Sequence, residues 1–247
     1  MIKTELAYCS IQELLDEKII LEMQDGNHGE RHPRQSDFVS EGIPFLTATN
    51  VIDEQVLIHL APRVSHQKAK TLRIGWIQPD DILLAHNATV GRVGIVPKFE
   101  GKAVIGTSLT YYRLNQQRLN SNFFALVLRS QDFQAQLEQA MEQTTRNQVP
   151  ITRQKELSVP LPPIAEQKRI ATIAQKADRL RRSAVSNRSS SACPLKTGEL
   201  SYPDDLSVSN SSLPNKSTGK ICGVVQDLLL TEFITHFDSR IIKKFFT

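Results

Sequence analysis

Through the first 115 residues the apolar positions form short runs and two-residue alternations, separated by turn residues. Segments of this kind that are rich in Val, Ile, Phe and Tyr are typical of β-strands. Strands are predicted at residues 43–48, 55–60, 74–77, 82–85, 90–96, 103–105 and 109–114. Two short helices precede or interrupt them, at 10–17 and 65–72. Ser10 with Glu13 three residues later has the spacing of a helix-capping box.

From residue 121 the apolar period changes from two to about 3.6, which predicts helices at 121–130 and 131–144. Phe123 and Phe124 lie on one side of the first helix. Phe133, Leu137 and Met141 follow each other at four-residue steps in the second. Such spacing is typical of side chains that pack in a core. Because strands come first and helices later, the predicted fold class is α+β, with a mixed strand scaffold and peripheral helices.

Residues 157–163 (LSVPLPP) must be extended, because each proline fixes φ and disfavours a helical conformation in the residue before it. Pro163 is suited to the first turn of the next helix, where a missing N–H costs little. In that helix the apolar residues follow the 3-4 spacing of a coiled-coil seam. The predicted helix-pairing residues are Ile170, Ile173, Ala177 and Leu180. The alternative is a surface helix that docks on its own domain.

After residue 188 the composition becomes rich in Ser, Asn and Pro, with few apolar residues. We therefore predict four parts. Residues 1–160 form a globular domain, 161–188 a spacer helix, 189–220 a disordered linker, and 221–247 a short amphipathic tail of unknown role.

The chain is mildly basic, with 30 Lys and Arg against 26 Asp and Glu and a pI of about 9.0. The basic residues are concentrated between 146 and 188, where ten of them face only three acidic ones. Such a stripe can neutralise phosphates. The three cysteines form no CxxC pair, and no segment has the apolar length of a signal peptide core or a membrane span. These features indicate a cytoplasmic chain that is not inserted in a membrane.

Three separated segments carry a resemblance to a known family: GIPFLTATNV at 42–51, DILLAHNATVGRVGIV at 81–96, and TRNQVPIT followed by PLPPIAEQKRIA near 145–172. In this order they resemble the specificity subunits of type I restriction–modification systems. The resemblance implies a subunit without catalysis and without a cofactor. Its target-recognition domain would read one half of a split double-stranded DNA sequence. Its helix would bind methyltransferase subunits, which a restriction subunit then joins.

This chain departs from that family, which normally carries two recognition domains, because it contains one. The hypothesis is either a half-length subunit that forms a homodimer through its spacer helix or a truncated product.

With the resemblance in hand, polar residues of the predicted loops and strand ends are the candidate DNA-binding residues. The long polar segment 24–37 is either disordered or functional. Asn can pair with adenine and Arg with guanine in the major groove. The DNA-binding candidates are Asn27, His28, Arg31, Thr47, Thr49, Asn50, His86, Asn87, Thr89, Arg92, Thr107, Thr110, Arg146 and Asn147. The candidates for phosphate or partner contact are Arg153, Lys155, Lys168 and Arg169.

Two other functions compete. Pro79-Asp80 followed by Glu100-Gly101-Lys102 fits the permissive PD…(D/E)xK pattern of Mg²⁺-dependent nucleases, in which two carboxylates bind the metal and the lysine activates water. Asp81, beside it, is expected to cap a turn. The other alternative is a scaffold that binds protein but no DNA. The histidines show no HExxH motif, and no metal site is expected.

Overall fold

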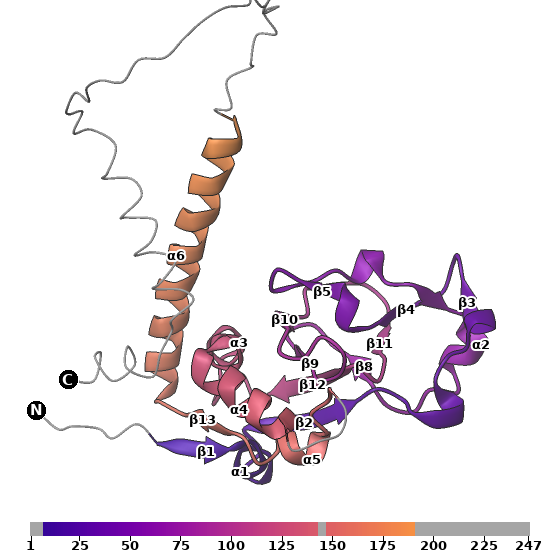
Figure 1. Cartoon of the computed structure of the whole chain (residues 1–247), viewed down its shortest axis with the longest axis horizontal. Coiled ribbons are helices and arrows are strands. Elements are labelled where there is room, and N and C mark those ends of the chain that lie inside the picture. The colour runs from indigo at the N-terminus through magenta and orange to yellow at the C-terminus, as the bar shows by residue number, and fades with distance from the viewer. Residues whose placement is uncertain (1–6, 143–146, 191–247) are drawn as a thin grey trace, which may run out of the picture. The chain divides into compact units, whose positions relative to one another are not determined.

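The computed structural model describes residues 7–142 and 147–190, and the side chains of Glu30 and of residues 181–190 are excluded from that description (Figure 1). The predicted tail and all but the first two residues of the predicted linker therefore lie outside the described residues. The described residues fall into two units, one of residues 7–142 and 147–173 and one that begins at Ala174. The first is the globular unit.

Short strands make up most of the globular unit. They are β1 (Tyr8–Ser10), β2 (Ile20–Asp25), β3 (Phe38–Val39), β4 (Ile43–Leu46), β5 (Val51–Ile52), β6 (Gln55–Val56), β7 (Arg63–Val64), β8 (Trp76–Ile77), β9 (Ile82–Ala85), β10 (Val93–Ile95), β11 (Ala103–Ile105), β12 (Leu109–Leu114) and β13 (Ser158–Pro160). The α-helices are α1 (Ile11–Asp16), α2 (His66–Ala69), α3 (Ser121–Arg129), α4 (Gln131–Glu142), α5 (Ile151–Gln154) and α6 (Ile164–Ser190). Short 3₁₀ turns are η1 (Gly29–Arg31), η2 (Gln35–Asp37), η3 (Ala48–Asn50) and η4 (Ile58–Leu60).

The strands form two mixed sheets and one small ribbon. One sheet has the order β2-β12-β9-β10-β6-β5 and the other β3-β7-β4-β11-β8, while β1 pairs with β13. The β10–β6 and β4–β11 pairs are parallel, and the other pairs of these sheets are antiparallel. Together with the helices, these sheets confirm the predicted α+β class.

The largest apolar cluster lies between the six-stranded sheet and helices α1, α3 and α4 (Figure 1). Phe123, Phe124 and Phe133 are buried in it, so the prediction that these aromatics are core residues is confirmed. The rings of Tyr112 and Phe124 meet edge to face with centroids 5.6 Å apart, an arrangement that adds to the area they bury.

Several predicted elements are present but shorter. Ser10 and Glu13 form the expected capping box, and Ser65 caps α2. The strand predicted at 55–60 was wrong after Val56, where the chain turns into η4. The strand predicted at 90–96 begins only at Val93, because Gly91 has a φ of +94° and turns the chain. Helix α5 and the strands β1, β2, β3, β5 and β7 were not predicted.

The proline-rich segment behaves as its chemistry requires. It is extended, its β13 residues pair with β1, and α6 begins directly after Pro163. Gln167 is 1% exposed and fastens the helix to the domain: its Oε1 accepts the N–H of Asn120 at 2.9 Å, and its Nε2 donates to the carbonyl of Pro162 at 2.8 Å. The first turns of α6 are thus part of the globular core.

That docking changes the interpretation of the helical seam. Ile170 is 4% exposed within the main apolar cluster, so the prediction that it pairs with another helix was wrong: it packs on its own domain. Ile173 and Ala177 are half-buried, and Leu180 is 65% exposed. No helix in the described part of the chain is both long enough and apolar enough to cross a membrane.

Arg113 forms an ion pair with the buried Asp81 and also links the two sheets. Asp81, at the start of β9, is 2% exposed and accepts the N–H of Gln78 at 2.7 Å, which confirms the expected turn cap. Its oxygens also accept Nε and Nη2 of Arg113 on β12 at 3.0 and 2.9 Å. Arg113 donates further to Glu22 on β2 and to the carbonyl of Trp76 on β8. Burial raises the pKa of the Asp81 carboxyl, and the hydrogen bonds from Arg113 oppose that shift.

Replacing Arg113 with Met is expected to lower the free energy of unfolding by about 3 kcal/mol, because it leaves Asp81 buried without its counter-ion. The matched control is Arg118→Met, which removes an exposed pair with Glu17 and should cost at most about 1 kcal/mol. Urea denaturation of both variants measures the difference, and equal losses would contradict a central role for Arg113.

Candidate nucleic-acid interface

Four loops leave the two sheets at one common edge. Strands β4 and β11 are parallel, so Leu46 and Ile105 end side by side. In the other sheet β9 ends at Ala85 opposite Leu109, the first residue of β12, and β2 ends at Asp25 opposite Thr110. The loops that follow, together with one later segment, are called the loop cluster below. It comprises residues 26–34, 47–50, 86–92, 106–108 and 147–149.

Backbone hydrogen bonds tie these loops to one another. The N–H of Gly106 donates to the carbonyl of Leu46 at 2.7 Å, and the N–H of Ala48 donates to Oγ of Ser108 at 2.9 Å. The carbonyl of Ser108 accepts the N–H of His86 at 3.0 Å. Gly26 packs directly on Gly106, since a Cβ on Gly26 would lie 2.3 Å from the Gly106 carbonyl carbon. The loops therefore form one rigid surface rather than four independent ones.

The 86–92 loop is fastened by a segment 60 residues further along the chain. The carbonyl of His86 accepts the N–H of Val149 at 2.8 Å, and the N–H of Ala88 donates to the carbonyl of Asn147 at 3.2 Å. Ala88 has a φ of +64°, a left-handed conformation that costs a non-glycine residue about 1 kcal/mol or more. Strain held in place in this way is typical of functional loops. With the 86–92 loop held in this conformation, Asn87, Thr89 and Asn147 lie at the surface.

The side chain of Gln154 stabilises the contact between the 86–92 loop and residues 147–149. Its side chain is fully buried, its Nε2 donates to the carbonyl of Val149 at 2.8 Å and to Oγ1 of Thr110 at 3.1 Å, and its Oε1 accepts the hydroxyl of Tyr112 at 2.7 Å. Ser108 and Gln154 organise the loop cluster, and both were missed in the sequence. No local pattern could have revealed them, because their partners lie tens of residues away.

His86 is a buried histidine within the loop cluster. It is 5% exposed, and neither ring nitrogen has a hydrogen-bond partner among the described residues. Burial lowers its pKa; the negative charge of Asp25 opposes that shift and the ring of His28 adds to it. His28 lies at the rim, with its Nε2 2.8 Å from Oδ2 of Asp25 and 59% of its side chain exposed. Burial of the imidazole therefore disfavours its protonation within the protein.

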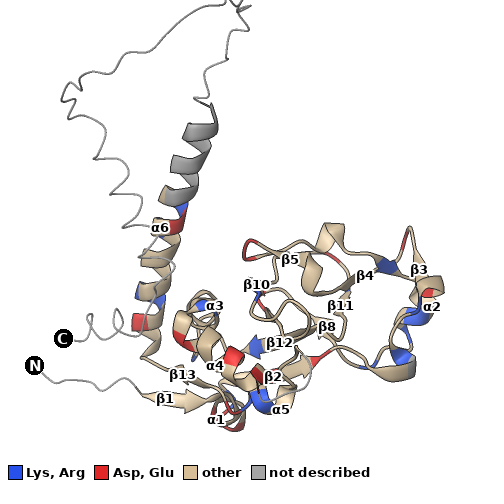
Figure 2. Cartoon of the chain, viewed as in Figure 1, with Lys and Arg blue, Asp and Glu red and all other residues tan. Residues whose placement is uncertain are grey.

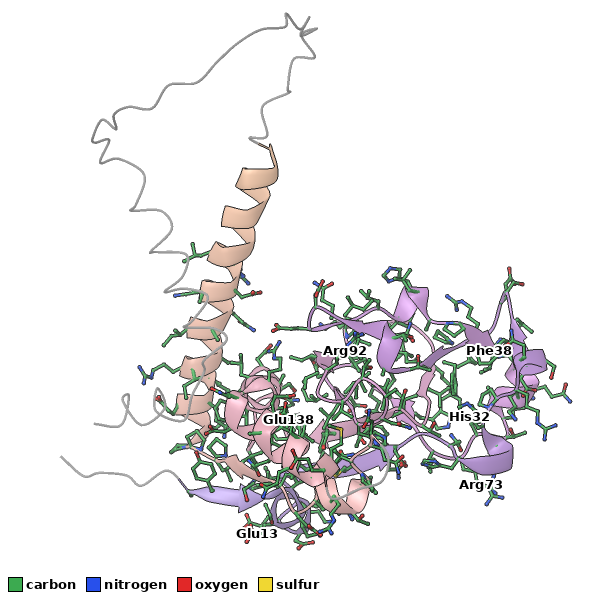
Figure 3. All side chains as sticks on the ribbon, in the orientation of Figure 1. Glu13, His32, Phe38, Arg73, Arg92 and Glu138 are labelled. Carbon is green, nitrogen blue, oxygen red and sulfur yellow. The ribbon has the colours of Figure 1, made fainter. Side chains whose placement is uncertain are left out.

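The structure brings most of the DNA-binding candidates to the surface of the loop cluster. Those that are exposed or half-exposed there are His28, Arg31, Thr47, Thr49, Asn87, Thr89, Arg92, Thr107 and Asn147. Arg92 also donates from Nη1 to the carbonyl of Val51 at 3.3 Å, which fixes its direction (Figure 3). Arg146 lies outside the described residues.

Three candidates have structural roles instead. Asn27 is 3% exposed, donates to the carbonyl of Ile74 at 2.6 Å and accepts the N–H of Arg73 at 3.0 Å. Asn50 is 5% exposed and accepts the N–H of Thr47 at 2.9 Å. Thr110 is fully buried against Gln154. Their polar groups are used inside the scaffold, so direct base contact is not retained for them.

The candidates for phosphate contact are partly engaged in short-range pairs. Arg153 on α5 lies 2.9 Å from Glu156, and Arg169 on α6 lies 2.6 Å from Glu166. The hydrogen bond to Glu166 raises the pKa of Arg169. Lys168 is exposed and Lys155 half-buried.

The nuclease pattern gains no support from the geometry. Asp80 sits in a turn with a φ of +68°. Glu100 and Lys102 line a cavity of about 440 Å³ whose lining does not include Asp80. Within the described part of the chain, no three His, Cys, Asp or Glu side chains gather as metal ligands would.

A rigid α+β scaffold that presents polar loop side chains on one edge has the architecture of a recognition domain. Comparison with known proteins identifies the kind of recognition domain. A family model described as the type I restriction modification DNA specificity domain matches residues 40–187. That match covers more than half of the chain, and the chain belongs to this family.

Solved structures show the same fold. One, from work on complex assembly and conformational transition of the type I R-M system, aligns over 76% of this chain and 43% of its own, with 20% identity and a TM-score of 0.53. The HsdS subunit from Thermoanaerobacter tengcongensis aligns over 76% of this chain and 40% of its own, with 18% identity and a TM-score of 0.50. This chain thus spans less than half the length of either. No curated protein matches it.

Because the pKa of His86 is lowered in the fold, the unfolded chain binds a proton more readily than the folded one below the ordinary value of 6.5. The free energy of unfolding should therefore fall as the pH drops below 6.5 and stop falling below the folded-state pKa. His86→Gln should remove this part of the pH dependence, while the control His59→Gln, at an exposed histidine, should keep it. Urea denaturation between pH 5 and 8 measures the slopes, and identical slopes in both variants would rule out His86 as its source.

Proposed function

We propose that this chain is a non-catalytic DNA-recognition subunit of a type I restriction–modification complex, and that its loop cluster reads one half of a bipartite target. One observation carries the proposal. In a chain of the specificity family, loops from both sheets and from residues 147–149 converge on one edge and present polar side chains there. The chemistry of that edge suits a DNA groove.

The exposed groups can discriminate between bases. An Asn side chain can both donate to and accept from the edge of adenine. An Arg side chain can donate two hydrogen bonds to two acceptors on guanine. Asn87, Asn147 and Arg31 are the loop-cluster residues with these groups at the surface. Each good two-bond pair is worth about 1–3 kcal/mol of discrimination. Thr47, Thr49, Thr89 and Thr107 would add single hydrogen bonds or contacts with thymine methyl groups.

Helix α6 is proposed to connect this domain to its partners. Its first turns belong to the domain core and carry the exposed Lys168 and Arg169, and beyond them Leu180 is exposed. An exposed apolar residue in a basic helix suits a partner helix with acidic flanks. The proposed partners are methyltransferase subunits, a restriction subunit that joins them, and a second copy of this chain pairing through Ile173, Ala177 and Leu180.

The proposal is tested by selection from random duplex DNA, with the full chain purified together with a methyltransferase subunit and without Mg²⁺. Enrichment of a split palindrome with a fixed spacer would show that two copies pair and act as one specificity subunit. Enrichment of a single short half-site would show a working recognition domain in a chain that does not dimerise. The proposal fails if no sequence is enriched.

Asn87→Ala should relax the preference at one base pair of the selected site, with a loss of about 1–3 kcal/mol against the parent sequence and an unchanged salt dependence. The control is Gln117→Ala. Gln117 is an exposed amide beyond the opposite end of β12, and its removal should change no position of the site. Competition binding with single-substitution duplexes gives the result. A uniform weakening at all sequences would show that Asn87 does not read a base.

A further inference from the structure

A second surface overlaps the loop cluster at residues 26–34 and extends onto the part of the molecule that contains α2. It is built from two segments, residues 26–37 and 65–75, and is called the α2 surface below. Together these segments carry five Lys and Arg residues against two acidic ones. Figure 2 shows basic positions on α2 and on the chain that leads from it. The concentration exceeds that of the whole chain, where 30 basic residues face 26 acidic ones.

The two segments are held together by specific contacts. Asn27 bonds the backbone at both Arg73 and Ile74, as described above. The N–H of Ser65 donates to the carbonyl of Asp37 at 3.1 Å, and β3 pairs with β7 immediately beside it. Asn27 was predicted to read DNA. Its side chain instead holds the two segments together and positions the backbone of Arg73. Because both segments are fixed, little conformational entropy of the backbone has to be lost when a ligand binds here.

Asp37 is the acidic residue of this surface whose side chain is described, and its negative charge is already neutralised. Asp37 lies 3.4 Å from Nζ of Lys68. The backbone N–H of Arg34 lowers the pKa of the Asp37 carboxyl, so the carboxyl is ionised and balances the Lys68 charge. Beyond Arg31, which belongs to the loop cluster, three cations are exposed and form no salt bridge with a described residue. They are Arg34, Lys70 and Arg73, and the charge of Arg34 also acts on Asp37. Arg73 points away from the body of the molecule (Figure 3).

We propose that Arg34, Lys70 and Arg73 of the α2 surface bind the phosphates of duplex DNA, while Arg31 and the other exposed residues of the loop cluster contact the bases. The inference rests on the proposed function, because it takes DNA as the ligand of the neighbouring loops. Two features favour it. Unpaired Arg and Lys side chains release condensed counterions when they contact phosphates, and such contacts position a protein without reading sequence. In addition, residues 26–37 begin at Gly26, which packs on Gly106 inside the loop cluster, so one continuous segment supplies both surfaces.

The test compares the full chain with the double variant Arg34→Gln/Arg73→Gln. Binding to the selected duplex and to a scrambled duplex is measured across salt concentrations. Each lost phosphate contact should reduce the slope of log K against log salt by about 0.9, so the double variant should lose about 1.8. It should weaken on both duplexes alike and keep the parent's base preference. Arg34→Lys/Arg73→Lys should restore most of the slope, because it restores the charges.

The control is Lys98→Gln, which removes an exposed cation in the turn between β10 and β11, outside the α2 surface, and should leave the slope unchanged. Thermal unfolding checks that each variant is folded. An unchanged slope in the folded double variant overturns the inference, as does absence of salt-dependent DNA binding by the parent. If the parent binds without sequence preference and the double variant lowers the slope, the phosphate surface stands and the proposed sequence reading fails. If the parent is selective and the slope is unaffected, only the phosphate surface fails.

Discussion

The globular unit depends on the ion pair between Arg113 and Asp81. A carboxylate that is 2% exposed is tolerated only when its charge and its lone pairs are satisfied. Arg113 does so with two hydrogen bonds, and its remaining donors reach Glu22 and the carbonyl of Trp76. One guanidinium therefore joins β12, β2 and the turn before β9 to β8 in the other sheet. The position of β9 sets the position of the 86–92 loop at its far end.

The strands form a fixed scaffold and the loops form the exposed surface. This arrangement explains how the domain can recognise a ligand through its loops. The strands are short, and several of them end at the same edge, so every loop begins from a fixed point. Long-range backbone hydrogen bonds, such as those from Val149 to His86 and from Ala88 to Asn147, then hold the loops before any ligand binds. Pre-organisation reduces the entropy lost on binding, and it also maintains the strained conformation of Ala88.

Helix α6 illustrates how far local reasoning extends. The proline run required an extended segment followed by a helix, and both are present because proline restricts its own φ and its neighbour's conformation. The apolar spacing along the helix could not indicate what each apolar residue contacts. Ile170 packs on its own domain, whereas Leu180 is exposed.

The sequence by itself determined the α+β class, the capping of α1 by Ser10, the core position of Phe123, Phe124 and Phe133, and the family to which the chain belongs. All of these depend on local spacing or on short contiguous motifs. The tertiary structure alone decided which polar residues are available. Asn27 and Thr110 have side chains as suited to DNA as those of Asn87 and Asn147, yet their partners, Ile74 and Gln154, lie in distant segments of the fold. A buried amide or hydroxyl must find a hydrogen-bond partner, and only the folding of distant segments determines whether that partner is the protein or a ligand.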